Sequence, residues 1–135
     1  MSVGILLMTY NDIGASLLES LQKMLGTLPL QVKVLPIDRE SDPIIFSQHA
    51  EKLCHALNQG EGILVLTDQD GTPLVKTTSH LLKQKYQVRI ISGVNLPMLV
   101  KLMNYHKRDL DALANSAISG GCQGILDVNS ILAPS

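Results

Sequence analysis

One stretch constrains this chain more than any other, residues 62–73 (GILVLTDQDGTP), because it joins an apolar run to a turn and then to a helix start. The apolar residues 63–66 are typical of a buried strand in a parallel sheet. Pro73 suits the first turn of a helix. Ligands of parallel sheets bind beyond the carboxyl ends of the strands. We therefore expect the first candidate site in the loop that contains Thr67, Asp68, Gln69, Asp70, Gly71 and Thr72.

The rest of the chain alternates between strand and helix patterns. Apolar runs predict four strands, at 3–8, 30–37, 63–66 and 87–92. Apolar residues at helical spacing predict five helices, over 13–25, 43–57, 73–85, 96–103 and 110–117. This alternation predicts an α/β three-layer sandwich on a mostly parallel, doubly wound sheet of four to five strands. Pro29 and Pro36 suit a strand at the sheet edge. We expect one domain over residues 1–135.

Capping residues and apolar stripes add detail to the helices. Asp109 is the predicted cap of the last helix, which we expect to be broken at Gly120 and Gly121. In the helix over 43–57, capped by Ser41 or Asp42, the predicted buried stripe includes His49. In the helix over 73–85, the predicted buried stripe includes Leu81.

Composition narrows the classes of function. The formal net charge is -1 and only 3% of the 135 residues are aromatic. A nucleic-acid partner is therefore not expected, since neither a basic surface nor stacking side chains are available. No apolar run reaches membrane-spanning length and no basic leader opens the chain, so we expect a cytoplasmic protein without membrane insertion. Cys54 and Cys122 are expected to be reduced, and no cofactor is expected.

Several motifs together resemble one family. The segment at 93–99 (GVNLPML) is the most specific of them. Three other motifs support the resemblance, and all occur in the same order as in the family: the block at 60–68 (GEGILVLTD), the Gly-Thr-Pro at 71–73 and Gly124-Ile125. The chain is similar to enzyme IIA of the mannose/fructose-type bacterial sugar phosphotransferase system. This resemblance implies a cytoplasmic phosphocarrier, usually a homodimer. It also implies two partners, a histidine-containing phosphocarrier protein and a IIB unit.

The residue that carries the phosphoryl group in this family is replaced here. The family histidine directly follows the Thr that ends the first strand, and that position holds Tyr10. A phenol, with a reference pKa of about 10, lacks the neutral nucleophilic nitrogen of an imidazole. The resemblance implies that Asp68 orients the histidine, and Asp68 is present. We expect the Tyr10 hydroxyl to bond to Asp68 and the Tyr10 ring to fill the site.

The loop that would hold the phosphoryl group also departs from the family pattern. Gly71, Thr72 and Pro73 occupy the expected positions, but the loop from Asp68 is one residue shorter than in the family. A shorter loop offers one fewer backbone N–H to an anion. Asp70 adds a negative charge near the place that phosphate would occupy.

Three hypotheses follow. The first is a phosphotransfer-deficient regulatory or interaction variant of the IIA fold. The second is a working phosphocarrier that uses another residue, with His49, His55, His80 and His106 available. The third is a receiver-like acidic module in which Asp12, Asp68 and Asp70 bind Mg²⁺, a cation that prefers oxygen ligands.

The C-terminal residues predict an assembly. The pairs Ile125-Leu126 and Ile131-Leu132 follow the last helix pattern and are too apolar for a free tail. We predict a homodimer in which residues 120–135 cross to the partner and lie at the sheet edge beyond the fourth strand.

Overall fold

The sheet has four parallel strands in the order β2-β1-β3-β4. The computed structural model describes residues 2–69 and 72–132. Its strands are β1 (Gly4–Tyr10), β2 (Val32–Ile37), β3 (Ile63–Thr67) and β4 (Val88–Ser92). The predicted doubly wound parallel sheet is confirmed. The proline-flanked strand β2 lies at an edge, as expected.

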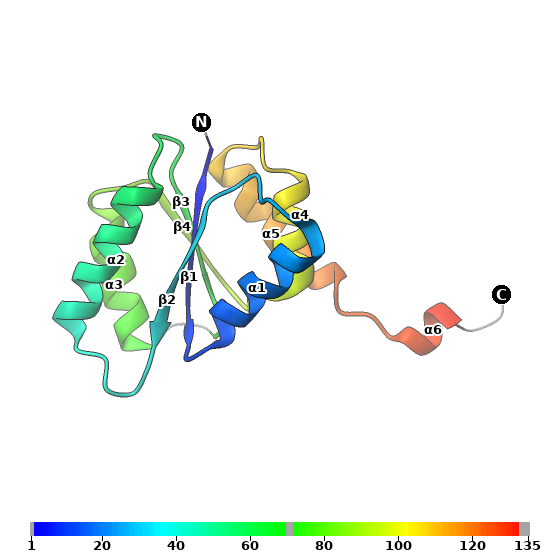
Figure 1. Cartoon of the computed structure of the whole chain (residues 1–135), viewed down its shortest axis with the longest axis horizontal. Helices are drawn as coiled ribbons and strands as arrows, with labels where there is room; N and C mark the ends of the chain where they lie inside the picture. Colours follow the sequence, from blue (N-terminus) through cyan, green and yellow to red (C-terminus); the bar gives the residue numbers. More distant parts are fainter. Residues whose placement is uncertain (1, 70–71, 133–135) are drawn as a thin grey trace.

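Helices cover both faces of this sheet (Figure 1). One face carries α1 (Ile13–Leu25), α4 (Leu96–Asn104) and α5 (Leu110–Gln123), and the other carries α2 (Pro43–Leu57) and α3 (Pro73–Lys83). Side chains of β1 alternate between two buried cores, with Ile5 and Leu7 in the first and Leu6 and Met8 in the second. Burial on both faces explains why the central strands are continuous apolar runs.

The last long helix is not broken at its glycines, so that prediction is wrong. Helix α5 continues through Gly120 and Gly121 to Gln123. A Cβ atom at Gly120 would lie 2.8 Å from the Lys101 Cβ atom. The Asn95 side chain also donates a hydrogen bond to the Gly121 carbonyl over 3.1 Å. The glycines therefore allow α5 to pack closely against α4, and this packing keeps the helix intact.

Two expected core positions are exposed instead. Helix α2 buries Phe46, Ala50, Cys54 and Leu57, and His49 lies outside this stripe. Leu81 on α3 is also exposed, at 45%. Helical periodicity indicates that a face is apolar, but the width of the buried stripe depends on how the neighbouring helix packs.

The C-terminal segment extends away from the domain (Figure 1). It contains a short helix, α6 (Val128–Leu132), in which no residue is buried. Five apolar side chains of this segment are between 58% and 78% exposed, namely Ile125, Leu126, Val128, Ile131 and Leu132. Exposed apolar side chains that lie together are typical of surfaces that contact another molecule.

The two cysteines are predicted to differ in reactivity. Burial, with a smaller contribution from Glu51, raises the pKa of the Cys54 thiol to about 11. Cys122 is exposed. Because the thiolate is the reactive form, iodoacetamide near pH 8 should label Cys122 in the folded protein and Cys54 only after unfolding. Mass spectrometry of the labelled peptides measures this, with a urea-unfolded sample as the control. Labelling of both sites at equal rates would show that Cys54 is accessible.

Candidate functional site

The loops after β1 and β3 meet at the point where the strand order reverses. The connection after β1 leads to one edge strand, and the connection after β3 leads to the other. Crevices at such reversals, beyond the carboxyl ends of the strands, are the usual ligand sites of doubly wound sheets. Tyr10 ends β1, and Asp68 directly follows β3. The two residues that the sequence singled out therefore lie at the position where this fold binds its ligands.

Tyr10 and Asp68 are in direct contact, although not through the atoms that we expected. The backbone N–H of Tyr10 donates to Asp68 Oδ2 over 3.1 Å, so the bond runs from the amide instead of the hydroxyl. The backbone N–H of Gln69 donates to the other oxygen, Oδ1, over 3.1 Å. Asp68 thus links the two loops at the reversal point. Its carboxylate is oriented by backbone donors, an arrangement that does not depend on the side chain at position 10.

The conformation of the first loop supports this contact. Asn11 adopts the left-handed region at a φ of 46°, which asparagine tolerates better than most residues. Its backbone N–H donates to the Ile37 carbonyl at the end of β2 over 2.9 Å. The loop therefore turns sharply away from the sheet after Tyr10 and leads directly into α1.

The Tyr10 side chain faces the α2 and α3 side of the sheet. It is half-buried and packs against the core that contains Leu6 and Met8. Beyond it, a groove of about 710 Å³ runs along α2 and α3. Apolar residues of this groove include Ile37, Ile44, Leu74, Leu81 and Leu82, and its hydroxyl groups come from Ser41, Ser47, Thr72, Thr77 and Thr78. The ring thus lies at the groove and does not close it.

Polar contacts cross the groove between its two helices. The hydroxyls of Ser47 on α2 and Thr78 on α3 lie 3.3 Å apart. Lys85 forms an ion pair with Glu51. These contacts link the two helices at the groove, and Ile44 and Leu81 are 70% and 45% exposed. The groove therefore presents apolar side chains to solvent with polar groups beside them.

The second loop is described in part. Asp70 and Gly71, predicted as a repelling charge and a phosphate-binding residue, lie outside the described residues. Thr72 accepts a hydrogen bond from the Val75 N–H over 3.3 Å and caps α3, which begins at Pro73. Both Thr72 and Pro73 line the groove together with Tyr10. The structure thus brings two of the three predicted phosphate-binding residues to the position of Tyr10.

The acidic-module hypothesis finds little geometric support. Asp12 precedes α1 and is exposed, and its side chain makes no capping hydrogen bond. Over residues 2–69 and 72–132, no group of three His, Cys, Asp or Glu side chains is placed to hold a metal ion. A site made of Asp12, Asp68 and Asp70 would depend on a residue outside those ranges.

Imidazoles are not found at the candidate site in the described part of the chain. His49, His55 and His80 are exposed on α2 and α3 and are absent from the groove lining. His106 lies after α4, where its Nδ1 atom is 3.0 Å from the Met103 carbonyl oxygen. At the point where the strand order reverses, the chain therefore has the phenol of Tyr10 and the carboxylate of Asp68, where the resemblance predicts an imidazole and a carboxylate.

The motif at 93–99 has a structural role. The N–H groups of Gly93 and Val94 both donate to the Thr67 carbonyl over 2.9 Å, which joins the ends of β3 and β4. Asn95 caps α4 by accepting from the Met98 N–H over 2.9 Å. This most specific segment therefore stabilises the ends of β3 and β4 beside the site.

Sequence reasoning identified Tyr10, Thr72 and Pro73 but missed other residues that form the groove. Arg39, Ile44 and Leu81 all line it, yet none was a candidate. One signal was available, because Ile44 and Ile45 are adjacent apolar residues outside the predicted stripe of α2. Exposed isoleucines at a helix start indicate a surface that makes contacts.

Comparisons with known proteins agree with this architecture. Residues 4–118 match the family model of the PTS system fructose IIA component. The chain is also similar to YadI of Escherichia coli (strain K12), which is provisionally named a phosphotransferase enzyme IIA component. The two sequences are 29% identical over 101 residues, and this match covers 75% of this chain and 68% of YadI.

Two solved structures share the fold. The mannose/sorbose-specific IIA subunit from Enterococcus faecalis has a TM-score of 0.82 at 20% identity, over 100% of this chain and 98% of that one. The EIIA component from Streptococcus agalactiae has a TM-score of 0.79 at 21% identity, over 95% and 98%. At these identities the structural likeness establishes the fold alone.

Proposed function

Because this chain belongs to the family of the PTS system fructose IIA component, we propose that it is a regulatory or interaction variant that carries no phosphoryl group at position 10. Family members work with a phosphocarrier protein and a IIB unit, and we propose that the groove beside Tyr10 contacts one of these partners. In this proposal the protein acts in the cytoplasm. The main observation behind this proposal is the half-buried phenol of Tyr10, which lies beside Asp68 where the strand order reverses.

The chemistry of a phenol supports this proposal. A histidine carrier attacks phosphorus with a neutral ring nitrogen and forms a labile phosphoramidate. A tyrosine hydroxyl is mostly protonated near neutral pH, and its phosphate ester is a poor donor to a further acceptor. The contact that Asp68 makes with Tyr10 runs to the backbone amide, so this bond gives the hydroxyl no general base.

The groove supports a role in binding. Its apolar residues Ile44 and Leu81 are exposed to solvent, while Arg39 and Gln48 provide polar groups beside them. Apolar centres with polar rims are typical of protein interfaces. A protein partner that docked here would contact Tyr10 directly, in a position where family members expose their histidine.

A mass measurement tests the loss of phosphotransfer. After incubation with phosphoenolpyruvate, enzyme I and the histidine phosphocarrier, the intact mass in alkaline buffer is expected to stay unchanged, because the site offers no imidazole nitrogen. A family member that has the histidine serves as the positive control. A stoichiometric phosphoryl adduct would refute the proposal. If that adduct mapped to His49, His55, His80 or His106, the protein would be a phosphocarrier that uses another residue.

We also propose that the protein is a homodimer whose residues after Gly124 pack at the β4 edge of the partner. Five exposed apolar side chains in this segment lack cover within the described part of their own chain. Edge strand β4 (Val88–Ser92) has one free side, because it pairs only with β3 among the described strands. Mutual exchange of the segment would give the isologous contact that two-fold symmetry requires.

A further inference from the structure

Two cationic side chains converge on one aromatic ring at the junction of α4 and α5. The Arg108 guanidinium carbon lies 3.9 Å from the centre of the Tyr105 ring. The Lys101 ammonium lies 5.8 Å from the same ring centre. Both distances are within the range of cation–π attraction. This junction belongs to the α4 and α5 face of the sheet, whereas Tyr10 packs on the face of α2 and α3.

The position of the Arg108 side chain is held from two directions. The Tyr105 ring supports its plane, and its Nη1 atom donates to Ser116 Oγ over 2.8 Å. Ser116 is only 3% exposed, and its hydroxyl donates to the Ala112 carbonyl over 2.9 Å, so its oxygen is oriented to accept from Arg108. A guanidinium has five N–H donors in a planar fork. This group is therefore pre-organised, and most of its donors remain available for a ligand.

A pocket of about 450 Å³ lies beside this pair and has no carboxylate in its lining. It is formed by Lys101, Tyr105, Arg108, Ala112, Asn115, Ser116 and Ser119. Its size is within the range of small-molecule sites. The lining provides two positive charges together with an amide and three hydroxyls. We name it the Arg108 pocket.

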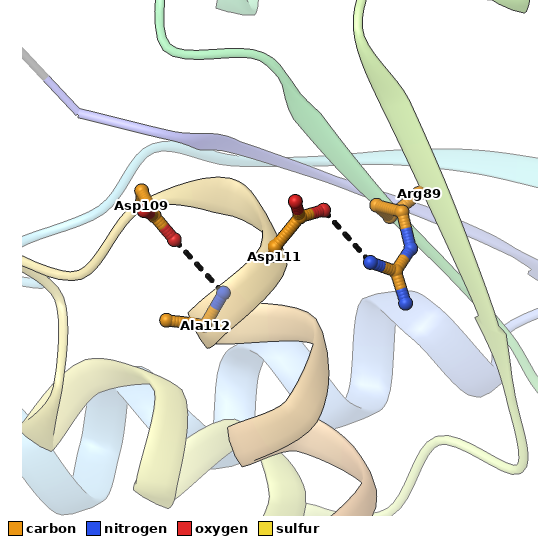
Figure 2. Close-up of polar contacts among 4 residues, drawn as sticks. All are labelled: Arg89, Asp109, Asp111 and Ala112. Carbon is orange, nitrogen blue, oxygen red and sulfur yellow. Dashed lines mark hydrogen bonds and ion pairs between the residues drawn. The ribbon is translucent and has the colours of Figure 1, made fainter.

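The acidic residues that follow Arg108 in the sequence are engaged elsewhere. Asp109 caps α5 by accepting from the Ala112 N–H over 2.9 Å. Asp111 accepts from Arg89 on β4 over 2.8 Å. Figure 2 shows Asp111 turned toward Arg89 and Asp109 turned toward its own helix. The Lys101 Nζ atom donates to the uncharged Gln123 side chain at Oε1 over 3.2 Å. In the described ranges no ion pair joins Arg108 or Lys101 to a carboxylate, so neither positive charge is neutralised there and both can attract an external anion.

We propose that the Arg108 pocket binds a small phosphate dianion, either free phosphate or the phosphate of a small monoester. Arg108 would donate two parallel hydrogen bonds to phosphate oxygens, a geometry that suits its fixed fork. Lys101 would supply the second positive charge, which matches the charge of the dianion. Asn115 and Ser119 line the same pocket and would contact the organic part of an ester. This site is independent of the chemistry at Tyr10.

Titration of the full chain tests the site, with chemical shifts of backbone amides as the readout. Inorganic phosphate, glucose 6-phosphate and unphosphorylated glucose are the probes. We expect saturable shifts on α4 and α5 with a Kd of about 1 mM or below for at least one phosphate probe, and none with glucose. Tighter binding of glucose 6-phosphate would identify a monoester as the ligand, and tighter binding of inorganic phosphate would identify the free ion.

Three single substitutions separate a built site from general electrostatic attraction. Arg108→Gln and Lys101→Gln should each weaken binding about tenfold or more, because each removes a charge-assisted contact. The matched control is Lys107→Gln, since Lys107 is adjacent in sequence and does not line the pocket. It should change Kd less than about twofold, as expected for a screened surface charge.

Some outcomes would overturn the proposal. They are the absence of saturable binding to the folded wild-type protein, equal binding of glucose, or equal weakening by Lys107→Gln. Circular dichroism confirms that each variant is folded. Phosphate binding in this titration does not depend on phosphotransfer. The proposal for the Arg108 pocket and the proposal for Tyr10 are therefore tested independently.

Discussion

Removal of residues 125–135 is expected to convert a homodimer into a monomer. The deleted segment carries five apolar side chains that are 58–78% exposed in the single chain. Burying one such side chain contributes roughly 1.5–3 kcal/mol. Mutual burial of these side chains in two exchanged tails is therefore expected to stabilise the dimer. Sedimentation velocity on the full chain and on the deletion measures the change in mass.

The position of the cut is set by the structure. A cut after Gly120 would remove Gly121, whose carbonyl accepts the Asn95 hydrogen bond, and would therefore damage the contact between α4 and α5. A cut after Gly124 leaves α5 (Leu110–Gln123) complete.

A point substitution provides a matched comparison with the deletion. Ile131→Asp places a charge within the tail and should weaken the dimer. Ile118→Asp places the same charge on α5, at a site that is 47% exposed and outside the tail, and should not. A full-length chain that sediments as a monomer, or a deletion that stays dimeric, would remove the tail from the interface.

Gly4→Ala is expected to lower the free energy of unfolding by about 2–3 kcal/mol. A Cβ atom at this position in β1 would lie 2.7 Å from the Leu57 Cβ atom and 2.9 Å from the Leu57 carbonyl oxygen. The carbonyl belongs to the backbone at the end of α2, so relief of the clash requires a shift of the helix against the sheet. Urea denaturation measures the loss, with an expected midpoint lower by about 1 M or more.

Gly121→Ala is the control for this prediction. A Cβ atom there would lie 3.0 Å from the Met98 Cε atom, the end of a flexible side chain that can move. Alanine is also favoured over glycine within a helix by about 1 kcal/mol. The control should therefore change the free energy of unfolding by no more than about 1 kcal/mol. Equal losses in the two variants would show that rigid backbone contact is not the cause.

Local sequence patterns determined the elements and their order. The apolar runs of β1 and β3 identify buried parallel strands, because each residue of such a strand meets a core on one face or the other. The cap at Asp109 was predicted correctly, and Asp42 is the one of two candidates that caps α2. These features follow from interactions over three or four residues, which the sequence shows directly.

The tertiary structure decided which atoms meet at the site. Tyr10 and Asp68 are 58 residues apart, and the observed bond joins a backbone amide to a carboxylate where we expected a hydroxyl. The direction of the loop after β1, with Asn11 in the left-handed region, sets that choice. A residue pattern does not encode this geometry, because it arises when two loops meet at the end of the folded sheet.

The packing of helices against each other decided the remaining features. Gly120 and Gly121 break a helix by propensity, yet here they allow α5 to approach α4. Leu81 is apolar and exposed because α2 and α3 leave a groove between them, and Asp111 pairs with Arg89 on β4 although Arg108 is closer to it in the sequence. Local patterns and motifs were thus enough to predict the family resemblance, the parallel sheet and the place of β2 at a sheet edge. The groove joins the end of β1 to α2 and α3, and the Arg108 pocket forms where α4 packs against α5, so both became visible only in the folded chain because a residue pattern does not encode how helices pack.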